Sequence, residues 1–522
     1  MHQIKTIQVL DLDLVNKLIN HPNDIFDLVN FIKDKTSIDI SSDRSFVESY
    51  ERDWSNIEGY ADAVSRPKNI KECAILLYLF SRANIPITIS AGKTNLTGSA
   101  TPEKGLVVSS ELMLLPKTTV DIKQKIATVA VGKFLEDIRN DILKITNKKL
   151  YYPVDPTSRK DARIGGTISC NASGFIPGEK GATRFWVESL SVVLLNGKMI
   201  QAKRGQYISK NRKFIIDDIE VPVPNYKRPK IKNASGPYTA DNDEIDFVDL
   251  IIGSEGIFGM IVECDLKLDD LSENNIDLFI PLKSERIAIK FYYYIQNIIQ
   301  SLKIDIKALE YFGYNSQAYM NNRSYLFDHN SQVGIYMQIP IFDKKVEDVA
   351  EYWMGILDKS KCNINLDKVL ILNQGTNWDK FFEARHSIPV NALEKTIKLD
   401  AVSMITDTIV PPNNFEEFLN YTHKLIRSND IEYLLFGHLG DCHLHFHLIH
   451  SKDEQKIAED IYANIVKESA RLGGVYSAEH GTGKRKRNDF IECYGIKAVN
   501  QIKLCKRAFD KKMLLNQGNI IK

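Results

Sequence analysis

The chain has 522 residues, of which 43% are hydrophobic and 26% are charged, the ordinary balance of a soluble globular protein. Its 68 lysines and arginines nearly cancel its 67 aspartates and glutamates, and this net charge of +1 argues against nucleic acid as the main partner. A chain of this length exceeds what one hydrophobic core supports, so we expect two or three domains.

The seven cysteines are scattered along the chain, with no C-x-x-C pair. A disulfide framework and a thiolate-bound zinc or iron–sulfur site therefore lack support, and a reducing compartment is the simplest fit. No run approaches the about 20 apolar residues of a membrane span, and the first residues do not read as a signal peptide. We expect a cytoplasmic protein, and peripheral contact with the inner face of the membrane stays open.

The first half of the chain predicts alternating helices and strands. Residues 1–45 are expected to be helical, since apolar residues recur at helical spacing in "DIFDLVNFIKD". Residues 69–85 predict a helix and "PITIS" (86–90) a strand, and this rhythm continues to about residue 270. It indicates an α+β domain over residues 46–275. Residues 203–244 are polar and contain prolines, so we expect an insertion there.

Three loops of this half are rich in small residues. They are "SAGKTNLTGSATP" (90–102), "DPTSRKDARIGGTISCNASG" (155–174) and "IIGSEGIFGMIVE" (251–263). Small residues let a backbone approach a ligand closely and point N–H groups at phosphate oxygens. Ordinary turns between strands are the alternative for any one loop. The Rossmann and P-loop patterns are absent, so the three loops favour a phosphate-bearing cofactor held by a different fold.

The composition changes near residues 270–285, where we place a domain boundary. Strands and amphipathic helices follow, and near their end "FGHLGDCHLHFHLIH" (436–450) holds five of the eleven histidines. If residues 442–449 are extended, His443, His445 and His447 share one face and Leu444, Phe446 and Leu448 the other. His438 lies in a glycine-bounded turn, from which it can fold back toward the strand.

A second loop, "GGVYSAEHGTGKRKR" (473–487), places Glu479 beside His480. Adjacent extended residues point apart, so one can bind a metal while the other faces a substrate. Two imidazoles and a carboxylate leave open positions on zinc, manganese or iron, which is typical of a catalytic metal site. The alternative to a metal site is a half-exposed strand with coincidental histidines. The basic run 484–487 is predicted to be solvated or to form a docking patch for an electron acceptor.

The order of these motifs resembles that of a known family. "SAGKTNLTGSATP", "PVDPTSRKDARIGGTISCNASG", "GATRFWVESLSVVLLNGKMI" and "DLIIGSEGIFGMIVE" resemble, in this order, the flavin-binding half of the FAD-linked oxidases of the vanillyl-alcohol oxidase/p-cresol methylhydroxylase type. The resemblance spans about residues 55–520. Within the family it points to the D-lactate, glycolate and D-2-hydroxyglutarate dehydrogenases.

The resemblance implies a fold of class α+β. A two-lobed FAD-binding domain of the PCMH type is followed by an α+β, ferredoxin-like substrate cap domain (276–490) that carries the metal site. A C-terminal segment (491–522) would return to the FAD domain. The residues expected to contact FAD are, in the first loop, Ser90, Ala91, Gly92, Lys93, Thr94, Asn95, Thr97, Gly98 and Ser99; in the second, Pro156, Thr157, Ser158, Gly165, Gly166, Ser169, Asn171, Ser173 and Gly174; and, further on, Gly256, Gly259, Ile261, Val262 and Asn516.

The same resemblance implies roles in the second half. His438, His445 and Glu479 match the family's metal ligands, His480 its proton acceptor, and Arg385, in "DKFFEARHSIP" (379–389), the arginine that binds a substrate carboxylate. A bidentate guanidinium suits that task. The divalent metal is expected to be zinc, manganese or iron.

Departures from the family pattern limit these assignments. Cys442 and His443 stand where relatives carry Gly and Asn, so His443 is a candidate extra or alternative ligand. Residues 407–411 are expected to form a strand, and Ile405 replaces a lysine of the hydroxyglutarate enzymes, which weakens the case for 2-hydroxyglutarate.

His447 and His450 carry no family role and are expected to be solvated or to support the site. No histidine lies in the loop 90–102, so we expect non-covalent FAD, and Lys93 is a candidate to face its pyrophosphate.

The resulting hypothesis is an FAD-linked dehydrogenase or oxidase of a small D-2-hydroxy acid, such as D-lactate. Its electrons would pass to a separate acceptor, such as a quinone, an electron-transfer flavoprotein or a partner subunit. The alternatives are a related flavin oxidase that uses oxygen or another alcohol, a metal-dependent hydrolase, and a non-catalytic flavin-binding subunit. A homodimer also stays open.

Overall fold

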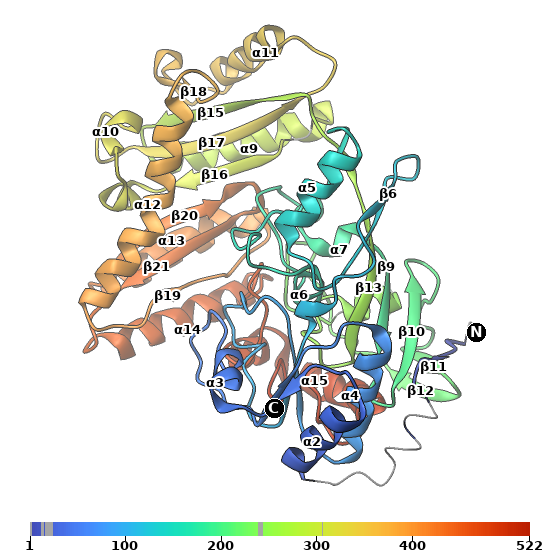
Figure 1. The fold of residues 1–522 in the computed structure, drawn as a ribbon. Coiled ribbons are helices and arrows are strands. Elements are labelled where there is room, and N and C mark those ends of the chain that lie inside the picture. Colours follow the sequence, from blue (N-terminus) through green and yellow to red (C-terminus); the bar gives the residue numbers. More distant parts are fainter. Residues whose placement is uncertain (1–2, 12–14, 16–23, 238–243, 305) are drawn as a thin grey trace.

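The computed structural model describes residues 3–11, 15, 24–237, 244–304 and 306–522, which build two layered units around separate hydrophobic cores (Figure 1). The first core draws its buried residues from positions 4–268 and 466–521, and the second from positions 276–472. The change of core between Leu268 and Ile276 supports the predicted boundary near residue 275, which we keep as a proposal.

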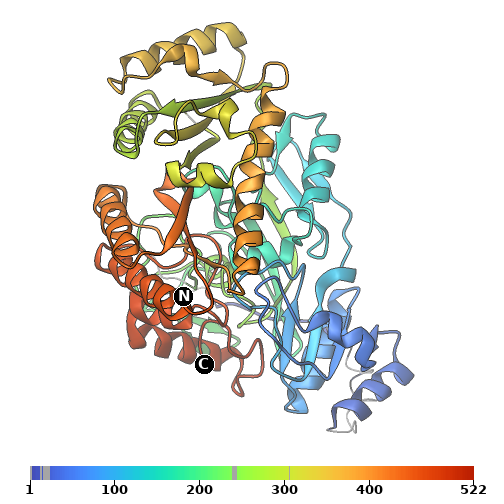
Figure 2. The same cartoon turned by 90° about the vertical axis from the view of Figure 1, so that its left-hand side faces the viewer.

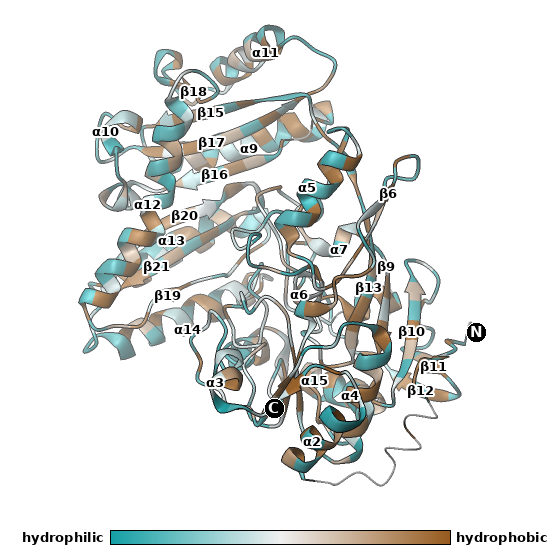
Figure 3. Cartoon of the chain, viewed as in Figure 1, coloured by the Kyte–Doolittle hydropathy of each residue, from teal (hydrophilic) through white to brown (hydrophobic). Residues whose placement is uncertain are grey.

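The first unit contains two main sheets. The six-stranded antiparallel sheet has the order β1 (Ile7–Gln8), β10 (Lys198–Lys203), β9 (Val187–Val193), β13 (Met260–Lys267), β7 (Ile126–Val129) and β6 (Thr119–Asp121). The four-stranded sheet has the order β2 (Ile40–Ser41), β3 (Ala63–Ser65), β5 (Leu106–Ser109) and β4 (Ile87–Ser90), with β5 parallel to both β3 and β4. Hydrophobic residues concentrate in strands such as β9 and β13 (Figure 3).

Helices cover these sheets and fill the space between them. Helix α4 begins where Asn69 accepts a hydrogen bond from the Glu72 amide, while the Glu72 carboxylate accepts one from the Lys68 amide, so the first turn is capped from both directions. The helices of this unit are α2 (Ile25–Lys35), α3 (Arg44–Val47), α4 (Ile70–Arg82), α5 (Leu135–Ile145), α6 (Ile164–Cys170), α7 (Thr183–Trp186), α8 (Phe247–Ile251) and α15 (Arg487–Phe509).

The expectation that residues 1–45 are helical is confirmed for Ile25–Lys35, which form α2. It is wrong at residues 7–8 and 40–41, which form short edge strands because their backbone groups pair with β10 and β3. Positions 12–14 and 16–23 lie outside the described residues.

The region 203–244 contains a hairpin of β11 (Lys213–Ile216) and β12 (Ile219–Pro222), which contacts α15. A second small sheet pairs β8 (Leu150–Tyr151) with β14 (Asp269–Asp270). Residues 238–243 lie outside the described part of the chain. The chain after the hairpin turns inward, and its residues 232–236 are buried.

The second unit is one seven-stranded antiparallel sheet. Its order is β18 (Leu370–Ile371), β15 (Asn274–Leu282), β17 (Val333–Ile341), β16 (Ala308–Phe312), β20 (Glu432–His438), β21 (His443–Ile449) and β19 (Met404–Ile405). The expected strand 407–411 forms only an isolated bridge between Ile409 and Val475, and the Asp407 carbonyl accepts a hydrogen bond from the Ala478 amide.

Helices lie on both faces of this sheet (Figures 1 and 2). One core joins the sheet to α9 (Glu285–Leu302), α11 (Val346–Lys359), α13 (Phe415–Ser428) and α14 (Gln455–Arg471). A smaller aromatic core on the other face joins it to α10 (Arg323–Leu326) and α12 (Asn377–Lys398). The predicted α+β class, with a second α+β unit after the first, is therefore confirmed. In the described part of the chain, no helix is both long and apolar enough to cross a bilayer.

The C-terminal segment returns to the first unit. Ile502 and Cys505 of α15 are fully buried in the first core, and so are Leu515 and Ile520 beyond the helix. Leu515 also makes a parallel bridge with Ile87 of β4. The last residues of the chain therefore help to fix the strand that leads into the first small-residue loop.

Replacing Ile502 by alanine tests this packing. Ile502 is fully buried, so Ile502→Ala is expected to lower the free energy of unfolding by about 2–5 kcal/mol, because it removes apolar contacts and leaves a cavity. Leu504→Ala on the same helix is the matched control, since Leu504 is 54% exposed and its loss costs about 0.5 kcal/mol or less. Urea unfolding measures both, and equal effects would contradict the docking of α15.

Candidate active site

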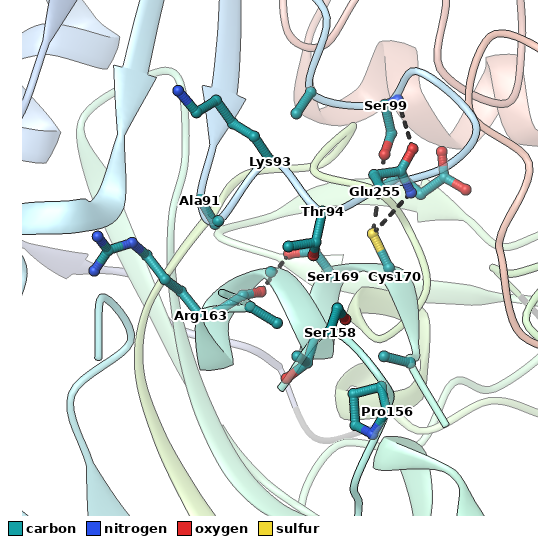
Figure 4. A pocket seen from close by; sticks show the side chains of 18 of the residues that line it. Ala91, Lys93, Thr94, Ser99, Pro156, Ser158, Arg163, Ser169, Cys170 and Glu255 are labelled. Carbon is teal, nitrogen blue, oxygen red and sulfur yellow. Dashed lines mark hydrogen bonds between the residues drawn. The ribbon is translucent and has the colours of Figure 1, made fainter. Parts of the chain in front are cut away.

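One cavity, of about 1350 Å³ including its open mouth, runs along the first unit toward the second sheet. All three small-residue loops line it, and Figure 4 shows several of their side chains around it. Of the residues predicted to contact FAD, those that line the cavity are Ser90–Asn95, Ser99, Pro156, Thr157, Ser158, Gly165, Gly166, Ser169, Ser173, Gly174, Gly256, Ile261 and Asn516.

Asn95 shapes the first loop. Its side-chain oxygen accepts hydrogen bonds from the amides of Thr97 (2.9 Å) and Ser99 (2.9 Å), which folds the loop back on itself after β4. Lys93 adopts a left-handed backbone (φ 57°), and its Nζ donates to the Ser49 carbonyl (2.6 Å). Its side chain leads away from Thr94 and Ser169 in Figure 4, and its amine is engaged by the Ser49 carbonyl, so its contact with a pyrophosphate stays a prediction.

Five residues predicted to contact FAD do not line the cavity. Asn171 ends α6 with a left-handed backbone, and its side-chain oxygen accepts from the Arg184 amide. The Thr97 carbonyl accepts from the amides of Lys484 and Arg485. The Asn171 side chain and the Thr97 carbonyl therefore hold their loops to other segments of the chain and do not face the cavity. The other three are Gly98, in a turn against Ile57, Gly259, against Val192, and Val262, in the core.

The cavity is also lined by residues that the motif comparison did not single out, among them Trp54, Asp155, Arg163, Cys170 and Glu255. Asp155, Arg163, Cys170 and Glu255 lie inside the quoted loops, so their position in the motif was the available signal. Trp54 comes from a segment outside these loops, and only the tertiary fold places it here.

Glu255 joins the third loop to the loop that carries His480. Its carboxylate accepts hydrogen bonds from the amides of Thr482 (2.7 Å) and Gly483 (2.8 Å). Burial outweighs these hydrogen bonds and raises the pKa of Glu255 to about 7. The two loops therefore meet through a carboxyl group that titrates near neutrality.

At the second-sheet end of the cavity, β20 and β21 form a tight antiparallel pair. His438 lies opposite His443, and Cys442 takes the left-handed conformation (φ 57°) that closes the turn between them. His438 is therefore the last residue of β20, and the expectation that it lies within the turn is wrong by one residue. Gly437 has φ 139°, and a side chain there would contact His445, so the close approach requires glycine.

The predicted alternation along β21 is present. Leu444, Phe446 and Leu448 belong to the core that includes α9 and α13. His443 and His445 point to the other face, where a ring nitrogen of His438, His443 and His445 and a carboxylate oxygen of Glu479 all lie within 4.8 Å of one another. Three imidazoles and one carboxylate thus converge from two strands and one loop.

In two of these imidazoles Nδ1 has an outer partner and Nε2 faces Glu479. His438 Nδ1 lies 2.7 Å from Glu310 Oε1, and its Nε2 lies 3.5 Å from Glu479 Oε2. His445 Nδ1 lies 2.9 Å from the Thr406 carbonyl, and its Nε2 lies 3.4 Å from Glu479 Oε1. An outer acceptor that fixes the ring and its tautomer is the usual setting of a metal-binding histidine.

The electrostatics of the cluster also suit a cation. Burial opposes the charged imidazole, but the carboxylates of Glu310 and Glu479 outweigh it and raise the pKa of His438 to about 10. Burial likewise opposes ionisation of Glu310, yet His438 and Arg385 bring its pKa to about 2. The protein therefore prefers a positive charge between these carboxylates, and its nitrogen and carboxylate donors fit zinc, manganese or iron.

His480 lies beside the cluster and is held by Asp407. The His480 amide donates to Asp407 Oδ2 (3.0 Å), and its Nδ1 lies 3.6 Å from the same oxygen. Burial is the main reason that the pKa of His480 falls to about 4, and Lys486 adds to the effect. His480 lines the cavity as a neutral imidazole at neutral pH.

Arg385 reaches the same region from α12. Its guanidinium lies 4.4 Å from the ring centre of Phe175, which lines the cavity, and 3.5 Å from Glu310 Oε2. Arg385 itself does not line the cavity. It lies behind Phe175, next to the carboxylate that also holds His438.

Lys232 is a member of the site that the sequence did not reveal. Its side chain is fully buried, and its Nζ lies 3.3 Å from Glu479 Oε2, 3.6 Å from Asp441 Oδ2 and 3.3 Å from the Gly174 carbonyl. It comes from the region 203–244, which the sequence predicts to be an insertion, and none of the motifs in the sequence includes residues 232–236.

Solvent exposure is wrong for His447 and His450. They are 3% and 1% exposed and bond to Ser403 and to the Val402 carbonyl, and their support of the site stays a prediction. The basic run 484–487 is solvated only in part. Arg485 is exposed, whereas Lys486 is buried against the Asp407 carboxylate, and Lys484, Arg485 and Arg487 donate to the Gln517, Ser55 and Gly518 carbonyls.

Comparison with known families agrees with this arrangement. The family described as "FAD binding domain" matches residues 61–203, and the family described as "FAD linked oxidases, C-terminal domain" matches residues 341–520. The chain therefore belongs to the FAD-linked oxidases, and it is an FAD-linked oxidoreductase.

Its relatives extend over the whole chain. It is 26% identical to the glycolate oxidase subunit GlcD of Bacillus subtilis over 93% of this chain and 94% of that protein. It is also 26% identical to a D-lactate dehydrogenase of Anaerostipes hadrus over 91% and 92%. A solved structure of alkyldihydroxyacetonephosphate synthase shares the fold, with a TM-score of 0.66 at 15% identity over 99% of this chain and 88% of that one.

The carboxyl group of Glu255 makes a pH-dependent prediction. Its pKa is raised in the folded protein, so folding favours its protonated form and this contribution to stability is lost as the pH rises from about 4.5 to 7. Between pH 5 and 8, the unfolding free energy of the FAD-free protein relative to Glu255→Gln is expected to fall by about 1–3 kcal/mol.

Urea unfolding at pH 5, 6.5 and 8 measures this difference. Glu263→Gln, which removes a partly exposed carboxylate from β13, is the matched control. Parallel pH profiles of the wild type and Glu255→Gln would show that Glu255 keeps an ordinary pKa.

Proposed function

We propose that this oxidoreductase converts a small D-2-hydroxy acid, such as D-lactate, to the 2-oxo acid with non-covalent FAD and a divalent metal. The observation that carries the proposal is that His480 and a cluster of possible metal ligands meet at one end of a cavity lined by the three loops, with Arg385 just behind the cavity wall at Phe175. The names of the D-lactate dehydrogenase and glycolate oxidase relatives support the substrate class.

The residues proposed to hold FAD are those of the predicted set that line the cavity. Gly166 has no side chain and lies against Ala91, where an added Cβ would come within 3.0 Å of the Ala91 side chain. Asn516 fixes two loops at once, because its side chain accepts from the Ile89 amide (2.8 Å) and donates to the Glu255 carbonyl (2.8 Å). The loop 90–102 contains no histidine, which supports non-covalent binding.

When bound, FAD would accept the hydride of the substrate, and a metal held by His438, His445 and Glu479 would polarise the hydroxyl oxygen. Glu310 and the Thr406 carbonyl would keep the two imidazoles in the orientation that presents Nε2. Lys232 would also hold Glu479, because its Nζ donates a hydrogen bond to Glu479 Oε2.

Arg385 would bind the carboxylate of the substrate. A guanidinium offers two parallel N–H donors to a carboxylate, so it fixes the orientation of the acid as well as its position. Arg385 lies next to Phe175 and Glu310, at the border of the cavity and the histidine cluster. A substrate that is held there would place its hydroxyl group toward His480 and the cluster.

His480 would accept the hydroxyl proton at Nε2. Asp407 occupies the Nδ1 side of the ring and, with a pKa held well below its usual range by His480 and Lys486 despite its burial, stays ionised. An ionised carboxylate on one side of an imidazole stabilises the imidazolium that forms when the other nitrogen takes a proton. This pairing supports His480 as the general base.

The reduced flavin requires an acceptor, which we propose to be separate from this chain: a quinone, an electron-transfer flavoprotein or a partner subunit. One relative is named as a subunit of an oxidase. Oxygen is the alternative acceptor, and oxygen consumption during turnover distinguishes the two. A homodimer and peripheral contact with the inner membrane face stay predictions. The family assignment leaves no support for a hydrolase.

Anaerobic flavin reduction tests the proposed reaction. D-lactate is expected to bleach the flavin absorption of the purified protein, L-lactate is not, and prior removal of the metal with a chelator is expected to abolish the bleaching. Acid precipitation is expected to release all of the flavin into the supernatant. An unbleached flavin with every D- and L-2-hydroxy acid of a panel would refute the proposal and favour a non-catalytic flavin-binding subunit.

Two substitutions separate the base from the metal ligands. His480→Asn is expected to slow flavin reduction by about 10²–10⁴-fold while the protein keeps its metal, since general-base catalysis is lost. His445→Ala is expected to lose both metal and activity, and both variants are expected to keep FAD.

Because the pKa of His480 is about 4, the wild-type rate is expected to stay constant between pH 6 and 8 and to fall only in more acidic solution. An acidic limb near pH 6.5 would contradict this assignment.

A further inference from the structure

His443 is placed for the same task as its two neighbours. It lies opposite His438 on the paired strands and two residues before His445 on the same strand. Side chains that are opposite on antiparallel strands, or two apart on one strand, share a face. Ring centres of His443 lie 5.5 Å from His438 and 4.5 Å from His445.

The environment of His443 repeats that of His438 and His445. Each ring has one nitrogen that faces an outer acceptor: Glu310 for His438, the Thr406 carbonyl for His445, and Asp407 Oδ1, at 3.2 Å from Nε2, for His443. Neither ring nitrogen of His443 has a hydrogen-bond partner among the described residues, although Nε2 lies 3.2 Å from Asp407 Oδ1, and the side chain is fully buried. A buried polar atom without a partner is destabilising unless a ligand or water satisfies it.

His447 shows that burial alone does not make such a site. It follows on the same face of β21, is 3% exposed and also has a partnerless Nδ1, but its Nε2 bonds to Ser403. It is not part of the group of ring nitrogens and carboxylate oxygen that converge within 4.8 Å, whereas His443 is. The difference between the two is the convergence with Glu479, His438 and His445.

We propose that His443 is a fourth protein ligand of the metal, which makes the donor set three imidazoles and one carboxylate. This inference rests on the metal centre of the proposed function. Imidazole donors favour zinc, iron or cobalt, whereas oxygen donors favour manganese, so the extra histidine selects against manganese. It would also take up a coordination position, which would leave fewer for the substrate and make the binding of the substrate carboxylate depend more on Arg385.

Metal binding by the FAD-loaded full chain tests the inference directly. The dissociation constants of Zn²⁺, Co²⁺ and Mn²⁺ are measured by competition with a chromophoric chelator for the wild type, His443→Asn and the matched control His447→Asn. His443→Asn is expected to bind Zn²⁺ and Co²⁺ at least about 10-fold more weakly, with a smaller loss for Mn²⁺. His447→Asn is expected to match the wild type, and the visible absorption of bound Co²⁺ is expected to change only in His443→Asn.

Equal metal affinities and an unchanged Co²⁺ spectrum in His443→Asn would overturn the fourth ligand and leave the rest of the proposed site intact. Absence of metal binding by the wild type would overturn the metal centre itself, and so both proposals. If His443→Asn does not fold, X-ray absorption of the zinc-loaded wild type decides, since three coordinated imidazoles support the inference and two refute it.

Discussion

The buried carboxylate of Asp407 is the interaction on which the site depends. It accepts hydrogen bonds from the Ser477 hydroxyl (2.7 Å), the His480 amide (3.0 Å) and the Lys486 ammonium (2.9 Å), and it faces the imidazole of His443. A fully buried carboxylate is stable only if its charge is compensated, so each of these partners is constrained in turn. One side chain thereby fixes the loop that carries Glu479 and His480 against β21.

A second carboxylate performs the corresponding task on the flavin side. Glu255 binds the amides that follow His480, while its own carbonyl accepts from Asn516 and Asn519 near the C-terminus. The third small-residue loop, the His480 loop and the C-terminal segment are thus joined at one residue. The position of the proposed base relative to the cavity is set by hydrogen bonds to two acids, Glu255 and Asp407, that are 152 residues apart in the sequence.

The sequence was sufficient where a local pattern carries the information. The alternation of leucine or phenylalanine with histidine in residues 443–448 predicted both the strand and its two faces. It was insufficient where a residue acts only through distant partners. Lys232 lies among polar residues and Glu310 in an apolar strand, so neither has a local pattern that indicates a site. Lys486 in the basic run 484–487 was misread for the same reason: a charge run predicts solvent exposure unless its acceptors, such as Asp407, are known.

Strand β21 has a consequence for how this enzyme can vary. Its side chains alternate between an apolar core and the histidine cluster, so insertion or deletion of one residue would send imidazoles into the core and leucines into the site. Stability and chemistry would be lost together. Insertions and deletions in this strand are therefore not tolerated, and its sequence can vary only by substitution, of which histidine at position 443 is an example.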